Sequence, residues 1–361
     1  MRITQKDIAR DLKISFATVN RAFNNTGYVS EELKKQIFDY AREKGYVPHR
    51  ASQVLVRNKI RTIAVFSSVF PEFFWDDIER GVLSAAEQIK PFDYEVHFHR
   101  IPENDTVQYI RLLKQEIKNG LEAVAFVCQW WVYDMRAVID TVEKMKVPYL
   151  LYNADAFDSN RICYIGTDYR AGGRLTANFI GKTLSLRSRG RVLAISNVVK
   201  NDRIAIGPEI HTERIRGFLD VMGEQYPGIS CQIELIDFKK NVSRQIHGIL
   251  GKYEHTVDAV YLINAASQEF FKALEQFDYR KTITVVHDIN NLIQVYLENG
   301  LLTAAVYQDP VLQGYTTVQT LEYILESNIR DRQKDIEIIH TLIFKENTDF
   351  IRKHYILKDE K

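Results

Sequence analysis

Apolar positions in the first 45 residues recur at spacings of three and four, which predicts three short helices with one buried face each. The three apolar stripes are Ile8, Ala9 and Leu12, then Val19, Ala22 and Phe23, and finally Leu33, Ile37, Tyr40 and Ala41. Polar residues mark the predicted helix ends. Thr4 and Asp7 nearly match a capping box, Ser15 and Ser30 suit N-cap positions, and Gly45 suits the end of the third helix.

Beyond residue 60 the pattern changes to short β-branched runs that alternate with longer amphipathic stretches. The first series of runs is Thr62–Phe66, Tyr94–Phe98, Ala123–Val127 and Pro148–Tyr152. The second series is Arg191–Ile195, Cys231–Ile236, Ala259–Ile263 and Thr282–Val286. Strands that alternate with helices form parallel sheets covered by helices. The expected fold is an N-terminal all-α headpiece followed by an α/β core of two parallel-sheet lobes.

Charge divides the chain at the same place. Residues 1–61 contain 13 Lys and Arg against 6 Asp and Glu, whereas the remainder contains 35 against 41. A chain with a formal net charge of +1 thus joins a basic head to an acidic body. Such asymmetry is typical of a protein whose one end meets phosphate, in DNA, RNA or a membrane surface.

The second predicted helix has the features of a DNA-recognition helix. It follows a tight turn, begins at a Ser cap, and leaves Phe16, Ala17, Asn20 and Arg21 facing outward. Helix-turn-helix modules insert such a helix into the major groove. Together with the basic charge, this pattern favours duplex DNA. A small helical bundle without that role is the alternative.

Residues 4–57 resemble the DNA-binding end of the lactose-repressor (LacI) family, and the similar layout continues through nearly the whole chain. The matching segments are Asp7-Ile-Ala, Ile14-Ser, Ala17-Thr-Val-Asn-Arg21, Asn24-Asn, Gly27-Tyr-Val-Ser30 and Gly45-Tyr-Val-Pro48. The resemblance implies that Phe16, Ala17 and Arg21 read bases, Arg21 through a bidentate contact with guanine. It implies phosphate contacts for the polar set Ser15, Thr18, Asn24 and Tyr28. Asn20 stands where Ser is usual, so its role in the DNA-binding set is open.

The segment Pro48–Arg57 resembles the family's hinge. Alone it is too short to be a stable helix, but two copies in a dimer can pack together and enter the minor groove. The resemblance makes Leu55 the apolar wedge between base steps, with Arg50 also on the DNA. A flexible linker is the alternative. The predicted domains are residues 1–47 for the helix-turn-helix, 48–60 for the hinge and 61–361 for an effector-binding and dimerisation core.

The resemblance extends to the core, which is similar to periplasmic sugar-binding proteins with discontinuous lobes. Lobe 1 is expected to hold residues 61–165 and 291–325. Lobe 2 is expected to hold residues 166–290 and 326–361, so that the chain crosses near residues 165, 290 and 325. Ile336–Phe344 is predicted as one strand that closes the second lobe.

Polar and aromatic residues follow the predicted strands, where ligands of open α/β sheets bind. Aromatic rings can cover the C–H faces of a sugar, while Asp, Asn, Gln and Arg pair with its hydroxyls. The resemblance matches eight residues to sugar-contacting positions: Ser67, Phe73, Phe74, Asn153, Arg214, Asn264, Asp288 and Gln308. Their places after strands add Gln129, Trp130 and Asp168. For any single residue, the alternative is a strand end that merely solvates a loop.

Several departures from the family leave the ligand open. Asn153 stands where Asp is frequent, the family's Asn-Asp pair appears as Asn264-Ala265, and Tyr169 stands where Asn is common. The Phe73-Phe74 pair favours a compact ring. A neutral monosaccharide or close derivative is the first expectation, a sugar acid paired with Arg214 is the second, and a purine is the third.

Motifs for catalysis are missing from the sequence. Gly172-Gly173 lacks the Lys-Ser/Thr ending of a phosphate loop, and neither a Gly-x-Ser-x-Gly elbow nor an HExxH pair occurs. His97 and His99 share a strand face, but a third metal ligand is not near them in sequence, so we expect no metal. The three cysteines lack CxxC spacing and suit a reducing compartment. We expect a protein without enzymatic activity or cofactor.

The location and partners follow from these points. The N terminus is charged rather than apolar, and no stretch is long and apolar enough to cross a membrane, so we expect a cytoplasmic protein. A homodimer suits a near-palindromic double-stranded DNA operator. The expected function is a transcriptional regulator, a repressor first, with a small-molecule effector between the lobes. Whether the effector induces or co-represses is open. The alternatives are control by a protein co-regulator or non-sugar metabolite, and a sugar-binding protein without a regulatory role.

Overall fold

The computed structural model describes residues 3–24, 28–46, 59–185, 190–197, 209–237 and 240–348. Its contacts separate two compact units. One unit contains the N-terminal helices together with Glu87–Glu95, and the other contains nearly all of two β-sheets and their helices. Among the described residues, helices long and apolar enough to cross a membrane do not occur.

The headpiece, residues 3–46, contains the three predicted helices. They are α1 (Gln5–Asp11), α2 (Phe16–Asn24) and α3 (Glu31–Glu43). Their apolar faces meet in one core that contains the predicted stripes, and its fully buried members are Ile8, Ala9, Val19, Ala22, Val29, Ile37 and Ala41. The helical periodicity of the sequence therefore identified this core correctly.

The helix ends of the headpiece also follow the sequence. The Thr4 hydroxyl accepts from the Asp7 backbone N–H and the Asp7 carboxylate accepts from the Thr4 N–H, at 3.0 Å, which completes a capping box. Asp thus serves where Glu or Gln is usual. Ser30 Oγ accepts from the Leu33 N–H at 3.3 Å. Gly45 ends α3 with a φ of +65°, a conformation that suits glycine.

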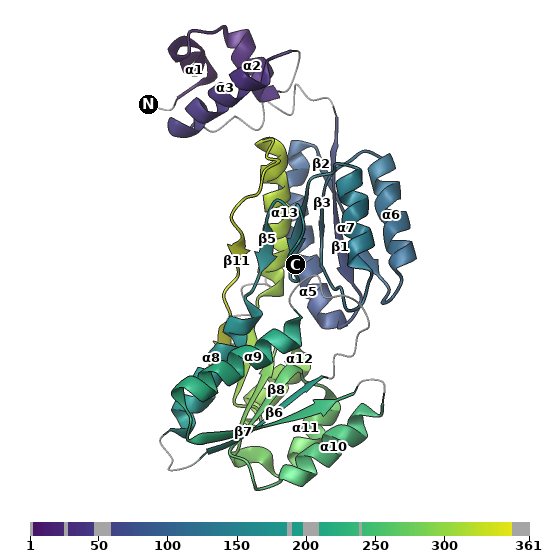
Figure 1. The fold of residues 1–361 in the computed structure, drawn as a ribbon, viewed down its shortest axis with the longest axis vertical. Helices are drawn as coiled ribbons and strands as arrows, with labels where there is room; N and C mark the ends of the chain where they lie inside the picture. The colour runs from purple at the N-terminus through teal and green to yellow at the C-terminus, as the bar shows by residue number, and fades with distance from the viewer. Residues whose placement is uncertain are drawn as a thin grey trace, which may run out of the picture. The chain divides into compact units, whose positions relative to one another are not determined.

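The first sheet has six strands in the order β11-β5-β4-β3-β1-β2. They are β1 (Arg61–Ser68), β2 (Tyr94–Ile101), β3 (Leu121–Phe126), β4 (Tyr149–Tyr152), β5 (Tyr164–Gly166) and β11 (Ile336–Glu337). The pairs β1–β3, β3–β4, β4–β5 and β5–β11 are parallel. The helices of this lobe are α5 (Glu72–Ile89), the 3-10 turn η1 (Lys90–Phe92), α6 (Thr106–Lys118), α7 (Met135–Lys144) and α13 (Pro310–Glu326). The α6 and α7 helices share an apolar core with the strands, and α13 packs on β3, β4 and β5 (Figure 1).

The second sheet also has six strands, in the order β12-β10-β9-β8-β6-β7. They are β6 (Gly190–Asn197), β7 (Ile229–Ile236), β8 (Ala259–Ala265), β9 (Ile283–His287), β10 (Ala304–Tyr307) and β12 (Thr341–Ile343). The β12 strand is antiparallel to β10, and the other pairs are parallel. Its helices are α8 (Tyr169–Leu184), α9 (Ile210–Gln225), α10 (Val242–Tyr253), α11 (Gln268–Gln276), the 3-10 turn η2 (Tyr279–Lys281) and α12 (Asn291–Glu298).

Both faces of the second sheet are buried, as expected for a mainly parallel sheet. Leu193 and Ile195 of β6 join the core under α10, α11 and α12. Val192 and Ala194, on the opposite face, join the core under α8 and α9. The two predicted series of strands and the two-lobe architecture are therefore confirmed.

The predicted lobe boundaries are wrong in two of three crossings. Residues 291–307 belong to the second lobe, because β10 pairs with β9 and β12, so the crossing expected near residue 290 lies between β10 and α13. The segment Ile336–Phe344 is two strands. Its first part, β11, pairs with β5 of the first sheet, and only β12 joins the second sheet. The third crossing is thus near residues 338–340, and the first crossing lies between β5 and α8 as expected.

The run Ala171-Gly172-Gly173 has a packing role. A Cβ atom on Gly173 would lie 2.0 Å from the Arg214 carbonyl oxygen, and one on Gly217 would lie 2.0 Å from the Arg170 carbonyl oxygen. The two glycines therefore let α8 and α9 approach backbone to backbone. This close contact fixes the position of Arg214.

Candidate functional site

The outward face of α2 presents the residues predicted to read bases. Phe16 has 46% of its surface exposed, and Ala17 and Arg21 are also exposed. The Ser15 hydroxyl caps the helix by accepting from the Thr18 N–H at 3.0 Å. A cap at this end fixes where α2 begins and hence which side chains face outward.

The remaining predicted DNA contacts differ in their surroundings. Thr18 Oγ1 lies 2.8 Å from Ser15 Oγ, and Tyr28 has 91% of its surface exposed. The Asn20 amide donates to Gln5 Oε1 at 3.2 Å, so this side chain links α2 to α1. The side chain of Asn24 lies outside the described part of the structure, as do Arg50 and Leu55 with the rest of the predicted hinge.

In the core, three predicted effector residues form one buried hydrogen-bond chain. Asp288, after β9, accepts from Gln308 Nε2 at 2.7 Å. The Gln308 carbonyl oxygen accepts from Gln313 Nε2 at 2.7 Å, and Gln313 Oε1 accepts from Asn153 Nδ2 at 3.1 Å. Asn153, Asp288, Gln308 and Gln313 are all buried. This chain connects the ends of β4, β9 and β10 across both lobes.

The backbone at these strand ends has a special conformation. Asn153 has a φ of +59° and Asp288 has a φ of +64°. Asn and Asp tolerate the left-handed region better than other residues with a side chain. The conformation turns each polar side chain away from its strand direction, which places both in the chain of hydrogen bonds.

Two members of this site were missed by the sequence analysis. Gln313 lies inside α13, where it is fully buried. Thr167, in the first crossing, is buried and donates to Gln308 Oε1 at 3.4 Å. The sequence feature that could have indicated Gln313 is its place on the apolar face of the α13 helix. Buried polar side chains of this kind need partners.

Arg214 is a buried cation with incomplete hydrogen bonding. Only 2% of its surface is exposed, and its Nη1 donates to the Ile263 carbonyl oxygen at 3.0 Å. Its Nε and Nη2 are buried without a hydrogen-bond partner among the described residues. The guanidinium carbon lies 5.7 Å from the centre of the Tyr169 ring. Such unused donors are costly in a protein interior, and a ligand with acceptor oxygens would satisfy them.

The groups around Arg214 are mostly neutral at physiological pH. Burial and, secondly, Arg214 lower the pKa of His340 to about 3. Burial, opposed by Glu209 and aided by Arg214, lowers the pKa of His211 to about 4, and His287 is lowered for similar reasons. Burial raises the pKa of Asp288, while Arg214 and the hydrogen bond from Gln308 act against this rise. Arg214 is therefore the cation of this cluster, and the Asp288 carboxyl group is its acidic neighbour.

Asn264, at the end of β8, adds a further acceptor. Its Nδ2 donates to Asn197 Oδ1, at the end of the neighbouring β6. The Asn264 Oδ1 and Ser196 Oγ atoms are buried without a hydrogen-bond partner among the described residues. The second lobe thus offers ligand donors and acceptors side by side, which suits a polyhydroxy compound.

The first lobe supplies the predicted aromatic and polar groups less uniformly. Ser67 is fully buried and donates to the Ser68 carbonyl oxygen at 3.0 Å. Phe73 is partly exposed, whereas Phe74 is buried edge-on against Trp75, with ring centres 5.1 Å apart. Phe73 is therefore the better candidate for stacking on a ligand.

Gln129 and Trp130 follow β3. Trp130 is buried in the apolar core under α6 and α7, so its ring serves packing. The Trp130 Nε1 and Gln129 Oε1 atoms are buried and lack a partner among the described residues. A role of these two polar atoms in effector binding stays a prediction.

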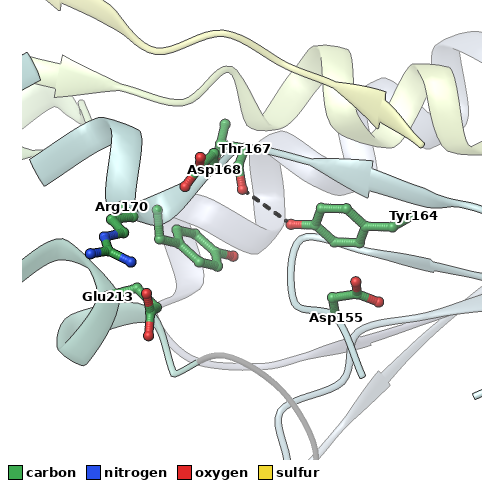
Figure 2. A pocket seen from close by; sticks show the side chains of 7 residues that line it. Asp155, Tyr164, Thr167, Asp168, Arg170 and Glu213 are labelled. Carbon is green, nitrogen blue, oxygen red and sulfur yellow. Dashed lines mark hydrogen bonds between the residues drawn. The ribbon is translucent and has the colours of Figure 1, made fainter. Parts of the chain in front are cut away.

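Asp168 caps α8 and lines a separate small pocket. Its carboxylate accepts from the Ala171 N–H at 3.1 Å, and its side chain is exposed. The pocket has a volume of about 200 Å³ and lies beside the first crossing, where Figure 2 shows Asp155, Tyr164, Arg170 and Glu213 around it. Tyr169 also lines it. Since the Tyr169 ring contacts Arg214 as well, this pocket adjoins the Arg214 site.

The two parts of the chain match different family models. Residues 63–328 match the model described as a periplasmic binding protein domain, and residues 4–49 match the model described as bacterial regulatory proteins, lacI family. The first match spans both sheets up to the end of α13.

Curated relatives match over shorter segments. Catabolite control protein B of Bacillus subtilis (strain 168) is 30% identical over 35% of this chain and 40% of its own length. The HTH-type transcriptional repressor CytR of Escherichia coli (strain K12) is 38% identical over 22% of this chain and 23% of its own. The chain therefore covers less than half the length of these relatives.

Solved structures share the fold of the core. A putative LacI transcriptional regulator from Bacteroides fragilis has a TM-score of 0.68 at 18% identity, covering 81% of this chain and 99% of that one. GanP, a glucose-galactose binding protein from Geobacillus stearothermophilus, has a TM-score of 0.62 at 20% identity, with the same coverage of both chains. At this level of identity the likeness shows the architecture of the core.

Proposed function

We propose that this chain, which belongs to the periplasmic binding protein domain family and begins with a lacI-family domain, is a DNA-binding transcriptional regulator controlled by a sugar. A repressor is the form we favour, since CytR, one of the relatives, is named a repressor. The protein would act in the cytoplasm as a homodimer, with one headpiece on each half of a near-palindromic operator.

The DNA-binding part of the proposal is carried by the exposed face of α2. Phe16, Ala17 and Arg21 face outward on a capped helix of a lacI-family domain, and this part of the chain is basic. Arg21 can pair with the O6 and N7 atoms of guanine, while the basic charge draws the domain to phosphate.

The test of DNA binding is selection of sites from a random duplex pool by the full-length protein. We expect enrichment of a near-palindromic site whose two halves are about one helical turn, or a multiple of it, apart. The Arg21→Ala variant should lose preference at one base pair in each half. Recovery of random sequences by the wild-type protein would contradict a sequence-specific regulator.

The effector part of the proposal is carried by the unused donors of Arg214. Its Nε and Nη2 atoms have no partner among the described residues, and Arg214 is close enough to Asp288 to act against the rise of the Asp288 pKa. A sugar hydroxyl can accept from a guanidinium while it donates to a carboxylate. Phe73 supplies an apolar face at the first lobe. The combination favours a monosaccharide or a close derivative, with a sugar acid second because a carboxylate pairs well with a guanidinium.

The linkage between the two sites follows from population shift. A sugar that binds the DNA-competent and the incompetent arrangement of the lobes unequally changes operator affinity by the ratio of those two affinities. The hydrogen-bond chain from Asn153 to Asp288 crosses between the lobes, so a change in their arrangement must alter it.

A thermal-shift screen of monosaccharides, sugar acids, sugar phosphates and nucleobases tests the effector. A ligand at about 100 times its dissociation constant adds about 2.7 kcal/mol to the free energy of unfolding, which raises Tm by several degrees. The same compound should change operator affinity in an anisotropy assay. If no compound in the panel raises Tm while selective DNA binding is intact, the sugar effector is contradicted, and a protein co-regulator is favoured.

A further inference from the structure

Two histidines and a glutamate meet at the edge of the first sheet. His97 and His99 are two residues apart on β2, the edge strand, so their side chains lie on the same face. Glu116 of α6 reaches both: its Oε2 lies 2.8 Å from His97 Nδ1, and its Oε1 lies 2.9 Å from His99 Nε2. One ligand atom from each residue lies within 4.8 Å of the others, and the described residues contain no second such group.

We propose that His97, His99 and Glu116 form a binding site for a divalent metal ion of the zinc class, with water at a fourth position. Zinc binds His nitrogen and carboxylate oxygen at about 2.0–2.2 Å in tetrahedral geometry. Neighbouring ligand atoms of such a tetrahedron lie about 3.3 Å apart. The two observed N···O separations, each to a different oxygen of the Glu116 carboxylate, are shorter than this by about half an ångström, so small movements of the side chains would admit an ion.

The surroundings of the three side chains suit an ion that enters from solvent. His97 and His99 keep 32% and 22% of their side-chain surface exposed, whereas Glu116 keeps 11%. The Phe66 ring, with its centre 4.8 Å from that of His99, holds this imidazole in place. The Glu116 carboxyl group is largely removed from solvent, and a divalent cation would stabilise its ionised form there.

The ligand types select among metals. Two nitrogens and one carboxylate match zinc, cobalt, nickel or copper, whereas magnesium and calcium prefer oxygen ligands throughout. The expectation of no metal site rested on the lack of a third ligand close in sequence, and the fold supplies that ligand from α6, 17 residues after His99. Because β2 is at one end of the strand order and β5 is next to the other end, the site is separate from the pocket beside the first crossing. A bound ion would join an edge strand to the helix that covers it.

The test is titration of the full-length, metal-free protein with zinc chloride, followed by calorimetry and by thermal shift. We expect one ion per chain at this site and a Tm rise of about 5 °C at a zinc concentration of about 100 times Kd. The His97→Gln/His99→Gln double variant should lose both signals. A matched control is His247→Gln, which removes a histidine hydrogen-bonded at 2.9 Å to Gln276 in the second lobe and should change neither signal.

The proposal is overturned if the wild-type protein takes up no zinc, or if the double variant binds zinc as tightly as the wild type. Should the double variant fail to fold, X-ray absorption of the zinc-loaded wild-type protein decides the point. A spectrum in which zinc has two imidazole ligands, and oxygen atoms as its other ligands, would support the site. A sulfur ligand, as from the partly exposed Cys231, or fewer than two imidazoles would refute it.

Discussion

The headpiece and the proposed effector site position their candidate functional residues in different ways. All three candidate base-reading residues of the headpiece lie on α2, within six positions of one another. In the core, Asn153 and its hydrogen-bond partner Gln313 are 160 residues apart. The series of hydrogen bonds that starts with this pair ends at Asp288 in the other lobe. A recognition surface on one helix depends on local capping, whereas the buried site depends on the packing of two lobes.

This difference indicates which side-chain substitutions should have only a local effect. A side chain on the exposed face of α2 has few partners, so its loss should affect one DNA contact only. A side chain in the core site has partners from distant elements, so its loss should disturb both ligand binding and stability. Three substitutions and a pH titration test this contrast.

The largest effect is expected for Arg214→Ala. Charge-assisted hydrogen bonds contribute about 1.5–3 kcal/mol each, so loss of the guanidinium should weaken effector binding roughly 100-fold or more. Operator affinity without effector should stay near the wild-type value. Calorimetry with the effector found by the screen, and anisotropy with the operator, measure the two quantities.

Arg216→Ala is the matched control for Arg214→Ala. Arg216 lies two positions along α9, is exposed and pairs with Glu213 at 2.7 Å, so its removal should leave effector binding unchanged. If Arg214→Ala reduces operator affinity in the absence of effector as strongly as it reduces effector binding, the contrast between the two regions is wrong.

The second prediction concerns Arg21→Ala. Loss of a bidentate guanine contact should cost about 1–3 kcal/mol at one base pair of each half-site and little at the others. The measurement is binding to a set of operators with single base changes. The control is Arg10→Ala, an exposed arginine on α1 that pairs with Asp7 and Asp11. An even loss over all operators would make Arg21 a phosphate contact.

The third prediction concerns Gln313→Ala. The substitution leaves the Asn153 amide without its acceptor and the Gln308 carbonyl oxygen without its donor, in a fully buried position. We expect a loss of about 2 kcal/mol in the free energy of unfolding, together with weaker effector binding. Gln294→Ala, at an exposed hydrogen bond to Glu298, is the control for stability in chemical denaturation. If Gln313→Ala unfolds with the same free energy as the wild type, the hydrogen bonds of Gln313 do not contribute to the stability of the core.

The fourth prediction is a pH dependence of the core. The folded-state pKa of His340 is lowered to about 3, below the ordinary value of 6.5, so the unfolded state binds more protons over this interval. The stability that neutral His340 contributes is complete above pH 6.5 and is lost as the pH falls towards 3, at up to about 1.4 kcal/mol per pH unit. His211 acts in the same direction down to about pH 4.

The His340→Gln variant isolates this contribution. Its unfolding free energy should depend less steeply on pH between 6.5 and 4 than that of the wild type, when urea titrations are compared at several pH values. The headpiece offers a reference, because its lowered pKa values include those of the partly exposed carboxyl groups of Asp7 and Asp11. An unchanged slope would mean that His340 does not stay neutral in the folded lobe.

The sequence predicted best where the determining contacts are short in range. The headpiece core, the Thr4–Asp7 capping box and the eight strands follow from apolar spacing and local caps. The crossings could not be predicted in this way. Both β10 and α13 are strongly apolar, and nothing in their own composition says which sheet each joins; β10 is fixed by its ladder with β9 and β12.

The candidate site shows the same limit. Asp288 and Gln308 were predicted from the family resemblance and from their places after strands, and the structure joins them directly. Gln313 was missed because its burial depends on β3, β4 and β5, which the α13 sequence does not reveal. An effector contact of Asp168 stays a prediction, and its carboxylate also caps α8. A polar residue just before a helix serves either purpose, and only the position of its neighbours distinguishes them.

The three crossings also set an order for folding during synthesis. The strand β11, which completes the first sheet, comes after all five parallel strands of the second sheet. A ribosome therefore finishes most of the second lobe before it has made α13 and β11 of the first. The first lobe therefore stays incomplete until nearly the whole chain has emerged from the ribosome. Until then β5 lacks its neighbour β11, and α13 does not yet cover β3 and β4. The elements α13 and β11, which are made near the end of synthesis, thus complete the lobe that was begun first.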